Sequence, residues 1–177
     1  MRYHDFSRAQ SGAILIFCLV FLLVLTLLAT TGMRSALMQE RMAGNLIRHQ
    51  SAVHAADAVL REAQQWLTAQ TDRPSASADG TTGVWLRDSL DPDESNSLPW
   101  WEELECLSED WWLARGTEAE VLPSAAAAAA PRYVIEELSH IMDSQLSAYR
   151  ITVRAPGLSN SVVVLQQSTA VQTFATK

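Results

Sequence analysis

One uncharged, apolar run near the N-terminus limits what this chain can fold into. No charged residue occurs between Ala9 and Met33. A run of about 20 mostly apolar residues is long enough to cross the hydrocarbon core of a membrane as a helix. The sequence therefore predicts a transmembrane helix at residues 13–33. The side chains that we expect to face lipid or neighbouring helices include Phe17, Cys18, Leu22, Leu25 and Leu28.

The small residues beside this run lie on its N-terminal side. An ordinary secretory signal has a shorter apolar core, and its small-residue cleavage site follows that core. Here Ser11 and Gly12 precede the apolar run and close a short charged leader, residues 1–12. A peptidase that cut after Gly12 would leave the apolar helix on the mature protein, with Ala13 as its first residue. The alternative is an uncleaved signal anchor.

Composition narrows the class of protein. The chain has 177 residues and a net charge of −7, which is enough length for one domain beyond the apolar run. The acidic balance argues against a nucleic-acid partner, because phosphate binding needs clustered Lys and Arg. No G-x-S-x-G, phosphate-loop, C-x-x-C or H-E-x-x-H motif occurs, so nothing positive indicates an enzyme. Cys18 and Cys106 are not expected to pair, and Cys106 is expected to be a buried small hydrophobe.

Residues 34–70 are predicted to continue the helix in amphipathic form. The first proline in the chain is Pro74. Apolar side chains recur at helical spacing on one arc, the pattern of a helix that packs one side on a core. Gly32 and Gly44 are expected weak points, because Gly costs roughly 1 kcal/mol relative to Ala in a helix. The predicted core face consists of Met38, Met42, Leu46, Val53, Leu60 and Leu67.

Residues 71–130 form a variable region that begins as a loop rich in Pro, Ser, Asp and Gly. Residues 84–86 are predicted to be a short strand or turn, and Pro99 is a suitable first residue for a helix. The six consecutive alanines at 125–130 are interpreted as a connector.

The most distinctive soluble feature is an acidic, tryptophan-rich stretch. Eight carboxylates and no Lys or Arg occur from Asp91 to Trp112. The pairs Trp100–Trp101 and Trp111–Trp112 are 11 residues apart, so on one helix they would share a face. One interpretation is a partner surface, because exposed tryptophan rimmed by charge is typical of binding hot spots. The other is a helix that buries one Trp of each pair and solvates its acidic side.

No metal or cofactor site is predicted. Asp91, Asp93 and Glu94 are close in sequence, but this spacing lacks the glycine and the distal glutamate of an EF-hand. The histidines are scattered, and we interpret them as structural side chains.

Residues 131–177 change to a period of two. Tyr149, Ile151 and Val153 alternate with polar residues, which predicts a strand with one solvated face. A second strand at 161–169 is more apolar and is expected to be more buried, and a third is predicted at 132–137. Three strands in series favour an antiparallel meander. A long helix packed on such a sheet is an α+β fold.

Several of these segments match one known family. The leader with its downstream apolar helix resembles the prepilin leader of type IV pilins and type II secretion pseudopilins. The segment Gln-Glu-Arg-Met-Ala-Gly-Asn at 39–45 resembles the signature that follows the membrane helix in PilX-type minor pilins. The strand segments at 132–136, 149–153 and 162–168 also resemble that family. The resemblance implies a pilin-like fold, with the long N-terminal helix packed on the C-terminal sheet.

The resemblance also assigns roles to residues near the N-terminus. It implies that an inner-membrane prepilin peptidase cuts after Gly12 and methylates the new amino group of Ala13. Phe17 would then be the fifth mature residue, where most pilins have a glutamate that pairs with a neighbouring subunit's N-terminal ammonium. A subunit without this carboxylate has no neighbour's charge to neutralise. We therefore expect a position at the end of the filament.

The function implied is that of a minor pilin of a Gram-negative type IV pilus. Such a protein would join a tip complex that primes pilus assembly and supports a large tip adhesin. Its partners would be other minor pilins, the major pilin, the adhesin, the prepilin peptidase and the inner membrane. It would span that membrane once, with its C-terminal domain in the periplasm, before entering the pilus.

Two alternatives remain open at this point. One is the K-type tip pseudopilin of type II secretion, although residues 70–130 are too few for its large inserted domain. The other is a single-pass periplasmic protein with an uncleaved anchor.

Overall fold

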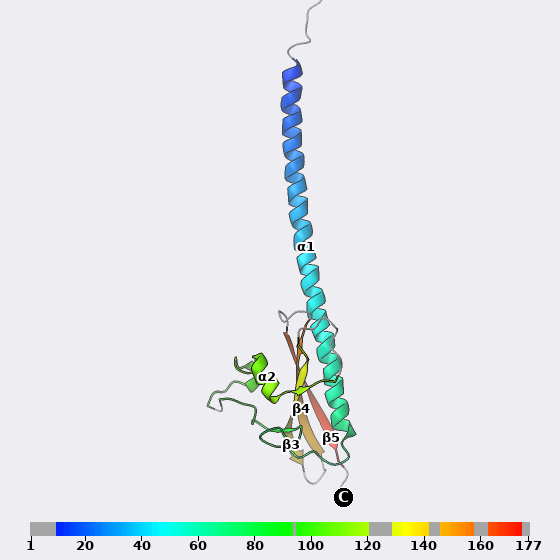
Figure 1. The fold of residues 1–177 in the computed structure, drawn as a ribbon, viewed down its shortest axis with the longest axis vertical. Helices are drawn as coiled ribbons and strands as arrows, with labels where there is room; N and C mark the ends of the chain where they lie inside the picture. The colour runs from blue at the N-terminus through cyan, green and yellow to red at the C-terminus, as the bar shows by residue number, and fades with distance from the viewer. Residues whose placement is uncertain (1–9, 94, 121–128, 142–145, 158–162, 175–177) are drawn as a thin grey trace, which may run out of the picture. The chain divides into compact units, whose positions relative to one another are not determined.

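A computed structural model describes residues 10–93, 95–120, 129–141, 146–157 and 163–174, with side-chain surroundings from Ile14 onward. The chain divides into two compact units, Met1–Leu46 and Ile47–Lys177. Helix α1 spans Gln10–Ala69 without a break, so Gly32 and Gly44 are both helical (Figure 1). By length and composition alone, α1 is long and apolar enough to cross a membrane. The large apolar side chains from Ile14 to Leu28 are exposed in the single chain.

The second unit contains a five-stranded, mostly antiparallel sheet (Figure 1). The three long strands β3 (Arg132–Ile141), β4 (Leu146–Pro156) and β5 (Val163–Thr173) are consecutive antiparallel neighbours. The short β1 (Trp85–Leu86) pairs parallel with β3, and β2 (Thr117–Glu118) pairs antiparallel with it. The predicted meander and the α+β fold are therefore confirmed, and each long strand extends beyond its predicted end.

One face of this sheet packs on α1. The buried helix positions are small or aliphatic: Ala52, Ala56, Val59, Ala63 and Leu67. The last four of them pack in one cluster with side chains of the central strands, among them Ile135, Ile151 and Val153. Burial of these apolar side chains is the main favourable contribution to holding helix and sheet together.

The predicted core face of the helix is partly wrong. Leu67 is buried, and Leu60 packs against the core as a half-buried side chain. Val53 is also half-buried. Met38, Met42 and Leu46 are exposed. The helical period predicted one continuous stripe, whereas the buried stripe runs through alanines at 52, 56 and 63. The three exposed residues belong to the N-terminal unit, outside the unit that contains the sheet.

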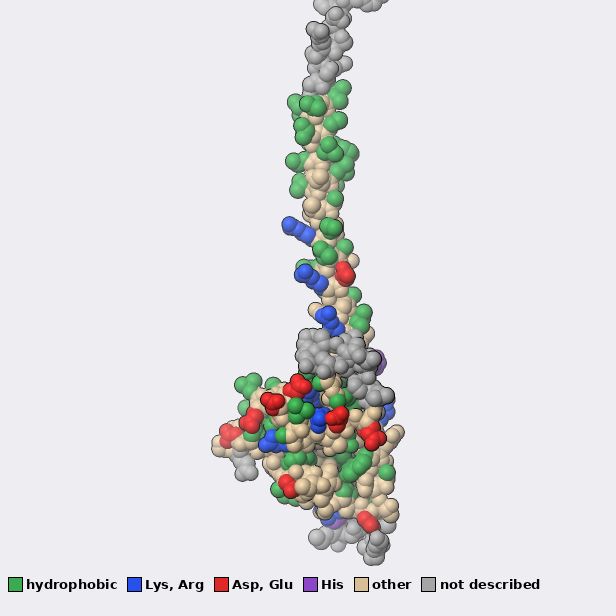
Figure 2. All heavy atoms as spheres, viewed as in Figure 1, with side chains coloured by type: hydrophobic (Ala, Val, Ile, Leu, Met, Phe, Trp, Pro, Cys, Tyr) green, Lys and Arg blue, Asp and Glu red, His purple; other side chains and the backbone are tan. Residues whose placement is uncertain are grey.

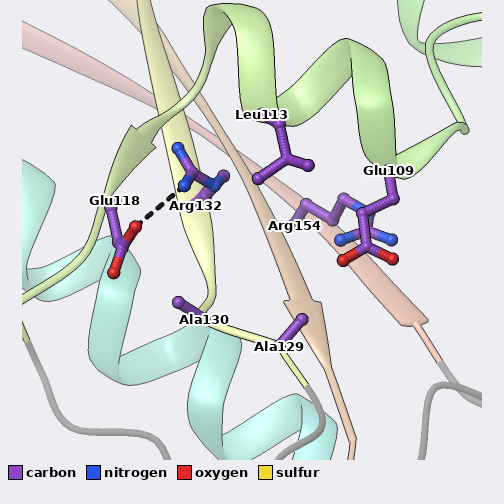
Figure 3. A pocket seen from close by; sticks show the side chains of 7 residues that line it. All are labelled: Glu109, Leu113, Glu118, Ala129, Ala130, Arg132 and Arg154. Atoms are coloured by element: carbon purple, nitrogen blue, oxygen red, sulfur yellow. Dashed lines mark hydrogen bonds and ion pairs between the residues drawn. The ribbon is translucent and has the colours of Figure 1, made fainter.

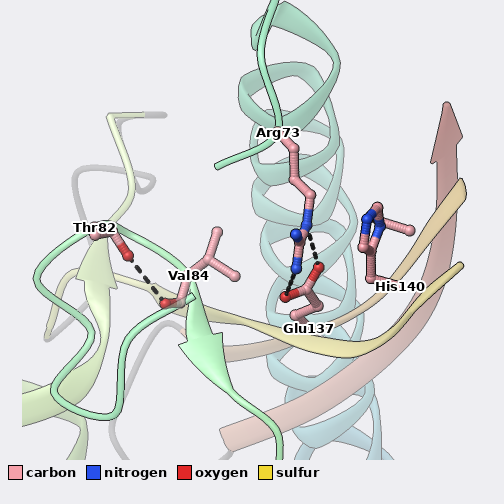
Figure 4. Close-up of polar contacts among 6 residues, drawn as sticks. Arg73, Thr82, Val84, Glu137 and His140 are labelled. Atoms are coloured by element: carbon pink, nitrogen blue, oxygen red, sulfur yellow. Dashed lines mark hydrogen bonds and ion pairs between the residues drawn. The ribbon is translucent and has the colours of Figure 1, made fainter. Parts of the chain in front are cut away.

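An ion pair joins the loop after α1 to the sheet. Arg73 donates hydrogen bonds to both carboxylate oxygens of Glu137 on β3, at 2.8 and 2.7 Å (Figure 4). Bidentate geometry of this kind fixes orientation as well as distance. Further along the same loop, the Thr82 hydroxyl donates to the Val84 carbonyl oxygen at 3.2 Å. The predicted loop at residues 71–83 is therefore an ordered connection on the sheet.

The prediction of a solvated second face on β4 is wrong. Thr152 and Arg154 on that face are buried, and Arg150 is mostly buried. The tryptophan-rich stretch covers them. The prediction that the more apolar strand β5 is the more buried one is also wrong, since several of its residues are exposed. β4 lies between β3 and β5, whereas β5 is an end strand of the sheet. Position in the sheet therefore outweighs composition.

Candidate functional site

The tryptophan-rich stretch does not form one helix. It contains a short 3₁₀ turn, η1 (Trp100–Glu102), and a separate helix, α2 (Glu109–Arg115). The Ser108 side chain caps α2 by accepting a hydrogen bond from the Trp111 backbone N–H at 3.2 Å. Glu109 and Asp110 in the first turn and Arg115 in the last complement the helix dipole. The expectation that both Trp pairs share one helix face is therefore wrong.

The tryptophans form a second core on the sheet face opposite α1. Trp100, Trp111 and Trp112 are buried, and only Trp101 is half-buried. Trp100 stacks on Trp111 with ring centroids 5.1 Å apart, and Trp112 packs edge-on against Trp111 at 5.3 Å. These rings enclose Leu90, Cys106 and Val134. A partner surface made of all four tryptophans is thus contradicted: one ring of the first pair and both rings of the second are buried.

A buried ion pair forms the polar base of this second core. Glu136 on β3 is fully buried and lies directly across from Arg150 on β4. One carboxylate oxygen, Oε2, accepts a hydrogen bond from the Trp100 indole at 3.1 Å and lies 3.2 Å from Nε of Arg150. The Arg150 guanidinium also stacks 4.4 Å over the ring of Trp101. The contacts of Trp100 with Glu136 and of Trp101 with Arg150 hold η1 against the sheet.

Burial dominates the electrostatics of Glu136. Desolvation raises the pKa of this carboxyl, and the nearby Arg150 and Trp100, which favour the charged form, offset the rise only in part. Sequence reasoning missed this pair. The available signal was a glutamate that directly follows the apolar segment Tyr133–Ile135 on a predicted strand, with an arginine on the next predicted strand.

The second core also holds the free thiol of Cys106. The Trp112 indole donates a hydrogen bond to the Cys106 carbonyl oxygen at 2.8 Å. Burial raises the pKa of the Cys106 thiol to about 12, so it stays protonated and unreactive at neutral pH. Cys106 is therefore a buried small hydrophobe, as predicted. Cys18 is exposed, and both cysteines are free.

A small pocket lies beside α2, between its Glu109 and Leu113 and the arginines of the central strands (Figure 3). Arg132 pairs with Glu118 at 2.8 Å and donates to the Gly116 carbonyl oxygen at 2.8 Å. Arg154 is buried next to Glu109, and desolvation lowers its pKa. Ala129 and Ala130 of the predicted alanine connector also line this pocket, and the rest of the connector lies outside the described residues. We assign no ligand to this pocket. Within the described ranges, no group of three His, Cys, Asp or Glu side chains converges.

The residues expected to act in the membrane and in processing lie in the first unit. Gly12 and Ala13 are in the first turn of α1, and their side-chain surroundings lie outside the described residues. Phe17 has 75% of its surface exposed, and Cys18, Leu22, Leu25 and Leu28 are also exposed. An apolar helix surface of this extent must be covered by lipid or by other apolar surfaces. The roles of these residues remain predictions.

Comparison with known families accounts for almost the whole chain. Residues 11–61 match the PilX N-terminal family model, and residues 62–172 match the model for the C-terminal part of the type IV pilus assembly protein PilX. No curated protein and no solved structure matches the chain. Members of this family are non-enzymatic pilins, and the apolar helix and antiparallel sheet fit that description. The chain therefore belongs to the PilX family of type IV pilus assembly proteins.

Proposed function

We propose that this chain is a minor pilin in the complex that primes pilus assembly, sits at the pilus tip and supports a large adhesin there. Before assembly it is held in the inner membrane by residues 13–33, with its C-terminal domain in the periplasm. The other minor pilins, the major pilin and the prepilin peptidase are its further partners. Family membership supports a role in pilus assembly. The tip position rests on one further observation, the phenylalanine at position 17.

Phe17 supports the tip position through the cost of buried charge. An ionised carboxylate inside an apolar helix bundle costs several kcal/mol unless a partner neutralises it. The resemblance to pilins implies that a glutamate at this position is neutralised by the N-terminal ammonium of the subunit ahead. Phe17 carries no charge, and its exposed ring suits apolar packing among helices. A subunit of this kind is stable with no subunit ahead of it.

We expect prepilin peptidase to remove residues 1–12 and methylate Ala13. Intact mass of the protein purified from cells with the peptidase should correspond to a chain starting at Ala13 with one added methyl group. Protein from peptidase-deficient cells should keep the full mass. Gly12→Val should block the cut, because the peptidase site must accept the residue before the scissile bond. A full-length mass in peptidase-positive cells would contradict processing and favour the uncleaved anchor.

Replacing Phe17 with glutamate tests the tip position. Gold labelling of sheared pili should show the wild-type chain at one end of each filament. Phe17→Glu should move label along the shaft, because the new carboxylate can pair with the N-terminal ammonium of the subunit ahead. Phe17→Leu serves as the matched control and should leave the label at the end. Wild-type label spread along the shaft would overturn the proposal.

A further inference from the structure

The tryptophan-rich stretch exposes leucines on the side away from its core. Leu104 has 86% of its surface exposed, and Leu98 and Leu107 are about half exposed. They alternate with Trp100, Cys106, Trp111 and Trp112, which all face the sheet. Because the buried side chains occupy the sheet-facing side, these leucines have no core within reach. Several apolar side chains exposed over one short stretch are a feature of interaction sites.

Carboxylates surround these leucines. Glu102, Glu105, Glu109 and Asp110 are exposed in the same stretch. Figure 2 shows acidic and apolar side chains close together over the part of the second unit where Figure 1 places α2. Three nearby arginines are engaged elsewhere: Arg115 stacks 5.1 Å over Trp111, Arg150 stacks on Trp101, and Arg154 is buried beside Glu109. The outer surface is therefore apolar and strongly acidic.

We propose that Leu104 and Leu107, with Glu102 and Glu105, form a docking surface for a basic, apolar helix of a neighbouring pilus subunit. Apolar contact supplies affinity, and the carboxylates select a positively charged partner. A membrane surface is disfavoured as the occupant, because anionic lipids repel an acidic patch. This docking surface is expected of the chain as a pilus assembly protein, whether or not it lies at the pilus tip.

Helix α1 of this chain carries the combination of side chains that we expect on the partner helix. Arg34 and Arg41 on α1 are seven residues apart, about two helical turns, so they lie on one side of the helix. Leu37, Met38 and Met42 are exposed along the same stretch. A related helix on another subunit would present arginines and aliphatic side chains together, which complements the acidic leucine surface in both respects. The buried tryptophans beneath hold this surface rigid, which reduces the entropic cost of docking.

Site-specific photocross-linking in pilus-assembling cells tests this proposal with the full chain. A photoreactive amino acid replaces Leu104, whose exposure lets the bulkier side chain fit without repacking. The matched control places it at Val171, an exposed position on β5. We expect an adduct from position 104 with another pilus subunit, mapped by mass spectrometry to a peptide containing Arg or Lys. Position 171 should give no adduct on that peptide.

Charge reversal provides the second arm. Glu102→Lys/Glu105→Lys should lower the cross-linking yield from position 104 by about fivefold, since it removes the attraction to a basic helix. Asp79→Lys/Glu120→Lys makes the same change in net charge elsewhere and should leave the yield unchanged. Near-ultraviolet circular dichroism of the tryptophans verifies that each variant folds. Adducts with lipid only, adducts with an acidic peptide, or a yield that charge reversal leaves unchanged would each overturn the proposal.

Discussion

Replacing Trp112 with alanine should lower the free energy of unfolding by about 3–5 kcal/mol, the range for truncating a buried aromatic side chain. Trp112 is fully buried, packs against two other tryptophans and donates a hydrogen bond to the Cys106 carbonyl. Alanine would remove the ring contacts, open a cavity and leave that carbonyl without its indole donor. Urea unfolding of the full chain in mild detergent, followed by far-ultraviolet circular dichroism of the strands, measures this loss.

The adjacent residue provides the control. Leu113 lies next to Trp112 on α2, but 54% of its surface is exposed and it lies outside the second core. Leu113→Ala should change stability by no more than about 0.5 kcal/mol, as is usual for surface positions. Equal destabilisation by the two substitutions would show that the tryptophans do not form the core beneath α2.

The fold of this chain could largely be predicted from local patterns. An uncharged apolar run, an amphipathic continuation and three alternating strands each carry a short-range signal, and their order alone favours a helix on a meander. The strand pattern of β4 was misleading for a clear reason. Arg150, Thr152 and Arg154 are polar, so alternation predicted solvent, but this face is covered by the tryptophan-rich stretch.

The second core could not be predicted because its contacts are long-range. Trp100 reaches Glu136, 36 residues later, and this contact exists only after β3 and β4 have paired. Sequence spacing instead suggested a single helix, with the two Trp pairs either exposed to a partner or each burying one ring. Tryptophan has the larger apolar surface, and Trp100, Trp111 and Trp112 are buried in the core, whereas Leu104 is exposed.

Replacing Arg150 with methionine should destabilise the protein by about 3 kcal/mol at pH 7, as is typical when one partner of a buried ion pair is removed. Glu136 would remain fully buried without its counter-ion, and Trp101 would lose the stacked guanidinium. Glu136→Leu/Arg150→Met should recover most of this loss, because it removes the uncompensated charge together with its partner. A double variant as unstable as Arg150→Met would show that packing by the guanidinium, and not buried charge, accounts for the effect.

The pH dependence of the single variant separates these two causes. The pKa of Glu136 is raised above its ordinary value of 4.5 by burial, so the folded state binds this proton more tightly than the unfolded state does. The contribution of this group to stability is therefore fully present below about pH 4.5 and falls as the pH rises through the folded-state pKa. Without Arg150 that pKa rises further, and the loss of stability with increasing pH becomes larger.

Arg150→Met should thus be closest in stability to the wild type near pH 4 and furthest from it at pH 7. Urea unfolding at both values measures the difference, which Glu136→Gln/Arg150→Met should abolish because glutamine carries no titratable proton. A deficit that is the same at both pH values would mean that Glu136 is not charged in the folded protein at pH 7, and that Arg150 stabilises η1 through its contact with Trp101 alone.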